Sequence, residues 1–212
     1  MHPNPVYHTE TRQQNIDFAR QRAFGILAVN GDKGPMMAHV PFLIDDDDDD
    51  DAAHLHLHLV RSNPIARALK APLQARLAIS GADGYVSPDW YEVPDQVPTW
   101  NYVAVHLTGT IALRPQDEMR DLLDRQSKHF EDQLAPKAPW KTDKMDADIL
   151  DKMMRQIVPC RMTIETVDGT WKLNQNKPDQ VRLRAADYMD AYGMGVETRI
   201  LAALMRGAGG QG

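Results

Sequence analysis

Histidine and leucine alternate strictly at positions 54–59 of the chain. Successive side chains of a strand point to opposite faces, so this pattern predicts a strand with three leucines on one face and His54, His56 and His58 on the other. Residues i and i+4 of a strand lie about 13 Å apart, so His54 and His58 are too distant to bind one metal ion. We expect the histidine face to contact solvent or a ligand, without a metal site.

The residues before this strand predict a helix followed by a hairpin. Thr11 and Gln14 have the spacing of a capping box, which predicts a helix that extends to about Arg22. Two apolar runs, at 24–30 and 36–44, are separated by residues typical of a turn. We therefore expect the first two strands here.

Seven consecutive aspartates occupy positions 45–51. Adjacent carboxylates repel one another and aspartate is depleted in sheets, so this run predicts a loop. It lacks the interleaved residues and the glycine of a calcium-binding loop, so we expect no metal ion there. The net charge is −6 with this run and would be +1 without it. No stretch has the clustered Lys and Arg that DNA phosphates require, so the charge pattern does not support DNA as a partner.

The chain after residue 60 alternates between helix and strand signals. Asn63 and Pro64 predict that a helix starts directly after the His/Leu strand, because Asn is a strong N-cap and Pro suits the first turn. Apolar runs at 74–80 and 84–87 predict two strands around a turn at Gly81–Gly84, and the run at 101–113 predicts a longer strand.

Further helices and a last hairpin complete the expected elements. Pro115 starts one helix, in which five residues fall mainly on one face: Met119, Leu122, Leu123, Gln126 and Phe130. Thr142 is expected to cap another, and the apolar positions of that helix are Met145, Ile149, Met153 and Ile157. Runs at 161–167 and 171–174 predict a hairpin that turns at Asp168 and Gly169, and two short helices follow.

Six or more alternating strands with few crossover helices favour an antiparallel barrel over a parallel sheet. The predicted fold class is therefore α+β, an antiparallel β-barrel with flanking helices. We expect a barrel domain at 1–177, a helical extension at 178–206 and a disordered tail at 207–212.

Composition limits the cellular setting. Cys160 is the only cysteine, so it forms no disulfide within the chain, and its sequence context is that of a strand residue. No apolar run reaches the roughly 20 residues of a membrane helix, and the N-terminus lacks the features of a signal peptide. We expect a soluble, cytoplasmic protein with no membrane partner.

Arg61, Ser62 and Asn63 are the clearest candidates for chemistry. No nucleophile elbow, phosphate-binding loop or zinc-protease motif occurs in the chain. At the start of a helix, a guanidinium, a hydroxyl and an amide converge with free backbone N–H groups, which is typical of an anion site. The alternative is structural: Asn63 only caps the helix and Arg61 is an exposed surface residue.

Four sequence blocks resemble one family. They are 38–43 (AHVPFL), 58–64 (HLVRSNP), 86–91 with 97–106 (VSPDWY and VPTWNYVAVH), and 171–177 (WKLNQNK). The chain resembles the PaiB-type family of FMN-binding negative transcriptional regulators, and the blocks occur in the family's order. The resemblance implies the split β-barrel of pyridoxamine-phosphate-oxidase-like flavoproteins, and a homodimer with two FMN sites across its interface.

The resemblance also implies which residues contact FMN. Arg61, Ser62 and Asn63 are expected at the phosphate, and the second strand, at His39, Val40 and Pro41, along the ring. The remaining expected cofactor residues are His58, Thr99, Trp100 and Asn101, with Lys172, Gln175 and Asn176 from the partner subunit. The alternative for the aromatic residues Trp100, Tyr102 and Trp171 is ordinary core packing.

Three functions remain open from the sequence. The family name implies a flavin-dependent regulator. FMN could equally serve an oxidoreductase that takes electrons from a reduced nicotinamide. Related split barrels handle haem, for which His8, His106 or His129 would be the axial ligand, although no spacing selects one. No catalytic residue is assigned.

Overall fold

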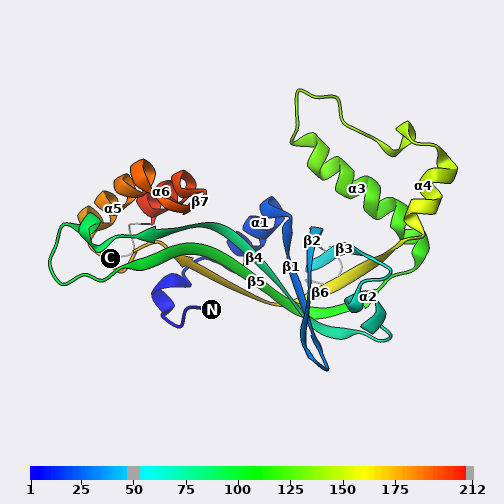
Figure 1. Ribbon diagram of the computed structural model, residues 1–212, viewed down its shortest axis with the longest axis horizontal. Helices are drawn as coiled ribbons and strands as arrows, with labels where there is room; N and C mark the ends of the chain where they lie inside the picture. Colours follow the sequence, from blue (N-terminus) through cyan, green and yellow to red (C-terminus); the bar gives the residue numbers. More distant parts are fainter. Residues whose placement is uncertain (47–52, 209–212) are drawn as a thin grey trace. The chain divides into compact units, whose positions relative to one another are not determined.

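The structure is a computed structural model that describes residues 1–46 and 53–208 (Figure 1). Helices separate runs of strands along the chain, and the fold class is α+β. The α-helices are α1 (Arg12–Arg22), α2 (Pro64–Ala68), α3 (Met119–Asp132), α4 (Ala147–Met154), α5 (Asp179–Tyr192) and α6 (Thr198–Gly207). The strands are β1 (Phe24–Gly31), β2 (Gly34–Asp46), β3 (Ala53–Val60), β4 (Leu73–Val86), β5 (Thr99–Leu113), β6 (Ile157–Lys172) and β7 (Met194–Val196). The 3-10 helices are η1 (Pro5–Tyr7), η2 (Pro88–Tyr91), η3 (Gln116–Glu118) and η4 (Thr142–Lys144).

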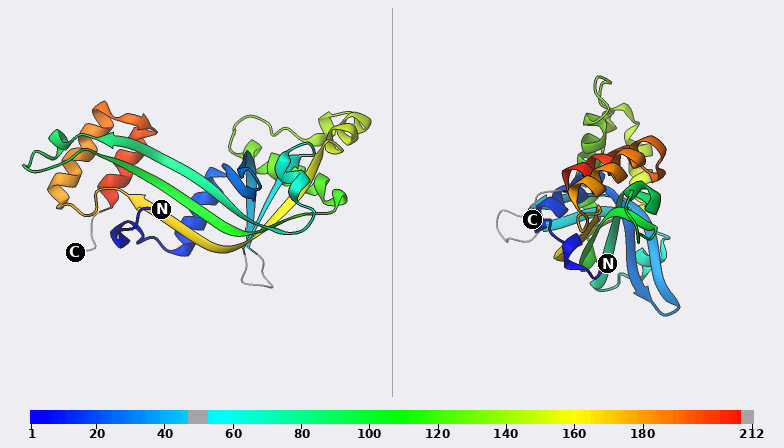
Figure 2. Two further views of the ribbon diagram at one scale, coloured as in Figure 1. Left: turned by 60° about the horizontal axis from the view of Figure 1, so that its bottom comes forward. Right: turned by 90° about the vertical axis from the view of Figure 1, so that its left-hand side faces the viewer.

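One compact unit contains the barrel and comprises Ala19–Ala78 and Leu107–Thr166. Its strands hydrogen-bond in the order β1-β2-β3-β6-β5-β4, and β1 also pairs with β4, which closes the ring (Figure 2). The core inside this ring is made of fully buried apolar side chains, among them Leu27, Phe42, Leu55, Leu77 and Leu107. The predicted antiparallel split barrel is confirmed.

The other compact unit comprises Met1–Phe18, Ile79–His106 and Val167–Gly212. It contains the remaining parts of β4, β5 and β6, and the edge strand β7, which pairs with β4. Helices α5 and α6 share one apolar core with these strands, in which Tyr91, Val103, Met189 and Leu201 are almost fully buried. The two predicted closing helices are confirmed, and the domain boundary at 177 stays a prediction.

β4 is a single strand from Leu73 to Val86, so the turn predicted at Gly81–Gly84 is wrong. Gly81 lies within this strand, where its missing side chain lets Phe18 and Val103 pack closely against the backbone. A Cβ there would lie 2.7 Å from the Phe18 ring and 3.1 Å from Val103. The glycines that suggested a turn serve instead to let a helix and a neighbouring strand approach.

β6 is likewise continuous, from Ile157 to Lys172, and the hairpin predicted at Asp168 and Gly169 is wrong. A Cβ at Gly169 would overlap the side chain of Asn15. The Asn15 amide oxygen accepts a hydrogen bond from the Trp171 indole at 2.9 Å. Gly169 therefore makes room for an asparagine that bonds the same strand two residues later.

The predicted start signals of two helices are confirmed. The Thr11 side chain accepts from the Gln14 N–H at 3.2 Å, and the Gln14 side chain accepts from the Thr11 N–H at 2.8 Å, which completes the capping box. The Asn63 side chain caps α2 by accepting from the Ile65 N–H at 2.9 Å.

The predicted cap at Thr142 is wrong. Thr142 begins the short η4, and α4 is capped by Asp146, whose side chain accepts from the N–H groups of residues 148 and 149. Ile149 and Met153 are more than half exposed. Ile157 lies in β6 rather than in the helix, so the apolar periodicity at 145–157 does not mark one buried face.

The aspartate run belongs partly to β2, which extends to Asp46, so the prediction of a loop is wrong at Asp45 and Asp46. The rest of the run lies outside the described residues. The predicted disordered tail begins inside α6, which includes Gly207, and positions 209–212 lie outside the described residues. No helix of the described chain is long and apolar enough to cross a membrane.

Candidate functional site

The histidine face of β3 packs partly against helix α3, and a ligand contact of this face stays a prediction. His58 Nδ1 lies 3.1 Å from the Gln126 side-chain oxygen, and the Gln126 amide donates to the Pro41 carbonyl at 3.2 Å. Burial lowers the pKa of His58 below its ordinary value. The leucine face is buried, as predicted.

The other two histidines also have partners within the unit. His56 lies 3.4 Å from the Asp45 carboxylate, and Arg125 of α3 donates to the same carboxylate at 2.5 Å. His54 lies 3.4 Å from the Thr163 hydroxyl of β6. Within residues 1–46 and 53–208, no group of three His, Cys, Asp or Glu side chains is arranged to hold a metal ion.

The outer face of the β1–β2 hairpin is apolar and open. Phe24 of β1 and Met37 of β2 are 54% and 59% exposed. The Phe24 and His39 rings stack, with centroids 6.4 Å apart. Val40 is 3% exposed and belongs to the barrel core. Of the three predicted ring contacts on β2, His39 and Pro41 therefore lie on the face opposite the core, whereas Val40 could contribute only its backbone.

The predicted phosphate residues lie at the junction of β3 and α2. Arg61 is held by its own chain: Nε donates to the Arg155 carbonyl at 3.0 Å, and Nη2 donates to the Gln116 side chain at 2.8 Å. The Asn63 side chain is used by the helix cap. Ser62 is exposed beside them. Arg61 and Asn63 thus have partners within the chain, and their role at a phosphate stays a prediction.

Three further predicted residues come together in the unit that contains α5. The Lys172 ammonium donates to the Thr99 hydroxyl and, at 3.0 Å, to the Trp100 carbonyl. The Trp100 ring is 42% exposed and contacts Tyr85 edge-on, with centroids 6.3 Å apart. Burial lowers the pKa of Lys172. One chain supplies all of these groups, so the subunit that contributes Lys172 to a pocket also contributes Thr99 and Trp100.

The other predicted residues of this unit, Asn101, Gln175 and Asn176, differ in accessibility. Asn101 is fully buried, and neither its side-chain nitrogen nor its oxygen has a hydrogen-bond partner within residues 1–46 and 53–208. Gln175 folds back on its own turn, where its oxygen accepts from the Leu173 N–H at 2.7 Å. Asn176 is exposed. A buried amide that lacks a partner among the described residues is costly.

The remaining candidate groups differ in how their side chains are engaged. Both ring nitrogens of His8 have carbonyl partners, Gly169 at 2.7 Å and His2, so His8 has no nitrogen left for a haem iron. His129 has an Nε2 that is buried without a partner. Cys160 lies in β6, as predicted, and burial raises the pKa of its thiol to about 12. A thiol this weakly acidic is not a nucleophile at neutral pH.

Sequence reasoning missed Phe24, Tyr85 and Gln126. Phe24 contacts the predicted residue His39, and Tyr85 contacts the predicted residue Trp100. Both contacts depend on the register between strands, which the sequence does not show. Gln126 was assigned to the inner face of its helix. Gln126 is a polar residue among the apolar positions of this helix face. Its presence there was the signal that the helix face contacts a polar face of a strand.

The donor set fits a flavin nucleotide. An isoalloxazine ring needs a flat apolar surface and hydrogen-bonding groups, and the phosphate needs cations or hydroxyls. In the barrel unit, the Phe24–His39 pair offers an apolar surface and Ser62 a hydroxyl. In the other unit, the exposed Trp100 offers an apolar surface, and Asn101 and Lys172 offer hydrogen-bonding groups. When bound, a flavin supplies hydride and one-electron chemistry.

The fold is the split barrel of a class of flavin-binding proteins. The FAD and haem binding protein from Mycobacterium smegmatis has a TM-score of 0.57 at 17% identity, over 89% of this chain and 82% of that one. The flavocytochrome Anf3 from Azotobacter vinelandii has a TM-score of 0.53 at 14% identity, over 76% of this chain and 68% of that one.

Residues 1–166 match the family model described as "Putative FMN-binding domain", so the chain belongs to this FMN-binding family, and FMN is its cofactor. A relative from Bacillus subtilis, "Protease synthase and sporulation protein PAI 2", is 27% identical over 193 residues. The match covers 88% of this chain and 85% of the relative. The predicted PaiB-type family is confirmed.

Proposed function

We propose that the chain is a flavin-dependent regulatory protein that holds FMN between two copies of itself. The observation that carries this proposal is the open apolar face of the β1–β2 hairpin. Phe24 and Met37 are more than half exposed there, on strands whose opposite face fills the barrel. Apolar faces of this kind mark surfaces that a partner or ligand covers.

The proposed cofactor residues fall into two groups. His39, the Pro41 region and the Arg61–Asn63 junction belong to the barrel unit, where Ser62 and the guanidinium of Arg61 would bind the phosphate. Thr99, Trp100 and Lys172 belong to the other unit and would come from the partner subunit, together with Asn101, Gln175 and Asn176.

The regulatory role rests on the resemblance to the PaiB-type regulators and on the name of the Bacillus subtilis relative, which is 27% identical. Direct binding to DNA has no support in the charge pattern, because the chain carries 30 Asp and Glu against 24 Lys and Arg. We therefore propose that regulation acts through flavin occupancy and a protein partner rather than through contacts with DNA.

Flavin titration combined with light scattering tests the site and the dimer. We expect one FMN per chain and a mass of two chains for the loaded protein. A stable, FMN-loaded monomer would rule out a site shared between subunits.

The regulatory role needs a separate comparison on FMN-loaded protein. Oxidation of NADH or NADPH is followed by absorbance, and binding to DNA fragments by anisotropy at several salt concentrations. Turnover of about 1 per second or more would favour an oxidoreductase. Salt-dependent binding to one DNA sequence would favour a direct repressor. We expect neither.

A further inference from the structure

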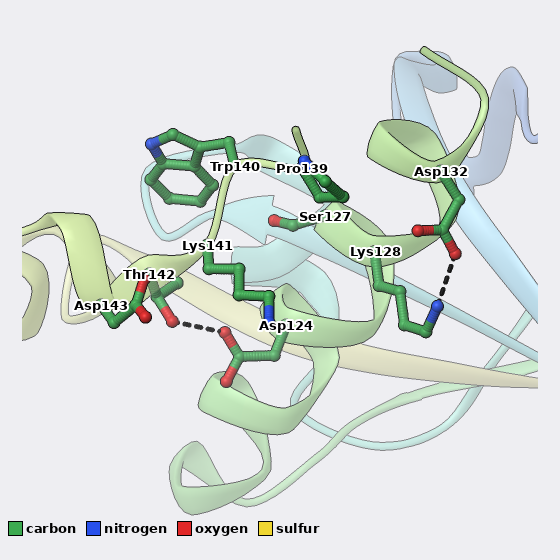
Figure 3. A pocket seen from close by; sticks show the side chains of 9 residues that line it. All are labelled: Asp124, Ser127, Lys128, Asp132, Pro139, Trp140, Lys141, Thr142 and Asp143. Atoms are coloured by element: carbon green, nitrogen blue, oxygen red, sulfur yellow. Dashed lines mark hydrogen bonds and ion pairs between the residues drawn. The ribbon is translucent and has the colours of Figure 1, made fainter. Parts of the chain in front are cut away.

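A cavity of about 580 Å³ lies between α3 and the segment 139–143 that follows it (Figure 3). This volume is within the range of small-molecule sites in proteins. Helix α3 contributes one wall and the segment contributes the other. The lining residues are Asp124, Ser127, Lys128, Asp132, Pro139, Trp140, Lys141, Thr142 and Asp143.

The cavity is on the face of α3 that points away from the barrel. Residues 124, 127 and 128 of α3 line it, and they share one helix face. Leu122 and Gln126 lie about half a turn away, are almost fully buried, and Gln126 contacts His58 of β3. The cavity is therefore separate from the proposed FMN residues.

Polar contacts at both ends hold the segment in place. At one end the Thr142 hydroxyl donates to Asp124 at 2.7 Å, and Arg120 donates to both residues, at 2.8 Å to Asp124 and at 2.6 Å to Thr142. At the other end the Trp140 N–H donates to Glu131 at 2.7 Å, and Lys137 pairs with the same carboxylate. These two anchors fix the walls of the cavity without any ligand.

Most charges in the lining are already neutralised within the chain. Asp124 is paired with Arg120, and Lys128 with Asp132 at 2.5 Å. Lys141 and Asp143 have no side-chain hydrogen bond or ion pair to any described residue, and both are exposed. The groups available to a ligand are therefore one ammonium, one carboxylate, the Ser127 hydroxyl and the half-buried Trp140 indole.

We propose that this cavity binds a small zwitterion that carries an aromatic ring, the chemical class of the free aromatic amino acids. The ligand carboxylate pairs with Lys141, the ligand ammonium pairs with Asp143, and the ring packs against Trp140. Opposite charges on the two lining residues favour a zwitterion over a simple acid or a simple amine of the same size. Aromatic pairs add to the affinity through stacked or edge-to-face contact.

The test uses L-phenylalanine as the probe, titrated into the full FMN-loaded protein by calorimetry. Two analogues separate the charges: 2-phenylethylamine lacks the carboxylate, and 3-phenylpropanoate lacks the ammonium. We expect saturable binding of L-phenylalanine with a dissociation constant of about 1 mM or lower, and each analogue to bind about two- to fivefold more weakly.

Variants assign each contact. Lys141→Ala should remove the preference for L-phenylalanine over 2-phenylethylamine, and Asp143→Asn should remove the preference over 3-phenylpropanoate. Trp140→Ala should weaken all three compounds. Lys152→Ala, an exposed lysine of α4 outside the lining, is the matched control and should change nothing.

Three results would overturn the proposal. The first is that L-phenylalanine does not bind at about 10 mM. The second is that both analogues bind as tightly as L-phenylalanine. The third is that Lys141→Ala and Asp143→Asn leave the preferences for L-phenylalanine over the analogues unchanged. Flavin absorbance, recorded in the same samples, keeps this outcome separate from a loss of FMN.

Discussion

Arg61→Ala separates a structural role of Arg61 from a role in phosphate binding. Arg61 donates to the side chain of Gln116 and to the Arg155 and Ile157 carbonyls. Exposed hydrogen bonds contribute roughly 0.5 kcal/mol or slightly more each, so we expect a loss of about 1–2 kcal/mol in the free energy of unfolding. A hydrogen bond to a charged phosphate contributes roughly 1.5–3 kcal/mol, so FMN should bind about ten- to a hundredfold more weakly.

The assay compares FMN with riboflavin, which lacks the phosphate. Wild type and Arg61→Ala are titrated with both ligands by flavin fluorescence, and their stabilities are measured in urea. Riboflavin affinity should change little. Arg67→Ala is the matched control, because it removes an exposed arginine of α2 and should leave both ligands unchanged. Gln116→Ala removes the partner of Arg61 but keeps the cation, so it should lower stability and preserve the ratio of FMN to riboflavin affinity.

Equal weakening of FMN and riboflavin by Arg61→Ala would refute the reasoning. The guanidinium would then act only by holding β3 to β6, and the phosphate would bind elsewhere. Such a result would leave the family assignment intact but would move the proposed cofactor site away from the β3–α2 junction.

Three other predictions concern packing, protonation and assembly. Gly169→Ala should lower the free energy of unfolding by about 1–3 kcal/mol, because its Cβ overlaps Asn15, whereas Gly207→Ala, with open space around it, should have no such cost in urea melts. Burial lowers the pKa of His58 in the folded chain below 6.5. Between that lowered pKa and 6.5, the unfolded chain therefore binds a proton at His58 that the folded chain does not. The free energy of unfolding should therefore rise with pH between the lowered pKa and 6.5, and His58→Gln should flatten this rise; an unchanged slope would contradict it. Met37→Glu places a charge on the open hairpin face and should shift light scattering to the monomer mass at unchanged stability, whereas a persistent dimer would place the interface elsewhere.

The sequence predicted the elements whose signals are local. The capping box of α1, the Asn63 cap of α2 and the alternation of β3 depend on residues within a few positions of each other, and all are present. Glycine caused the main errors. In the sequence, Gly81 and Gly169 resemble turn residues. In the structure, they lie in strands and leave space for side chains that are distant in the sequence.

The site was harder to predict than the fold for the same reason. The alternation in β3 separates the histidines from the leucines, but it does not indicate what covers the histidines. The answer depends on Gln126, 68 residues further along the chain. Similarly, the pairing of Lys172 with Thr99 could be found only from strand neighbours, since 73 residues separate them in sequence.

The pairing of β3 with β6 has a consequence for synthesis of the protein. The contact between His54 and Thr163 joins residues 109 positions apart. A ribosome adds about 5–20 residues per second, so β3 waits roughly 5–20 s for its neighbour. During that time its unpaired backbone groups are open to other nascent chains. The carboxylates at 45–51 immediately precede this strand, and their mutual repulsion keeps such chains apart. We therefore expect replacement of the aspartate run by serines to reduce the soluble yield without weakening the finished fold.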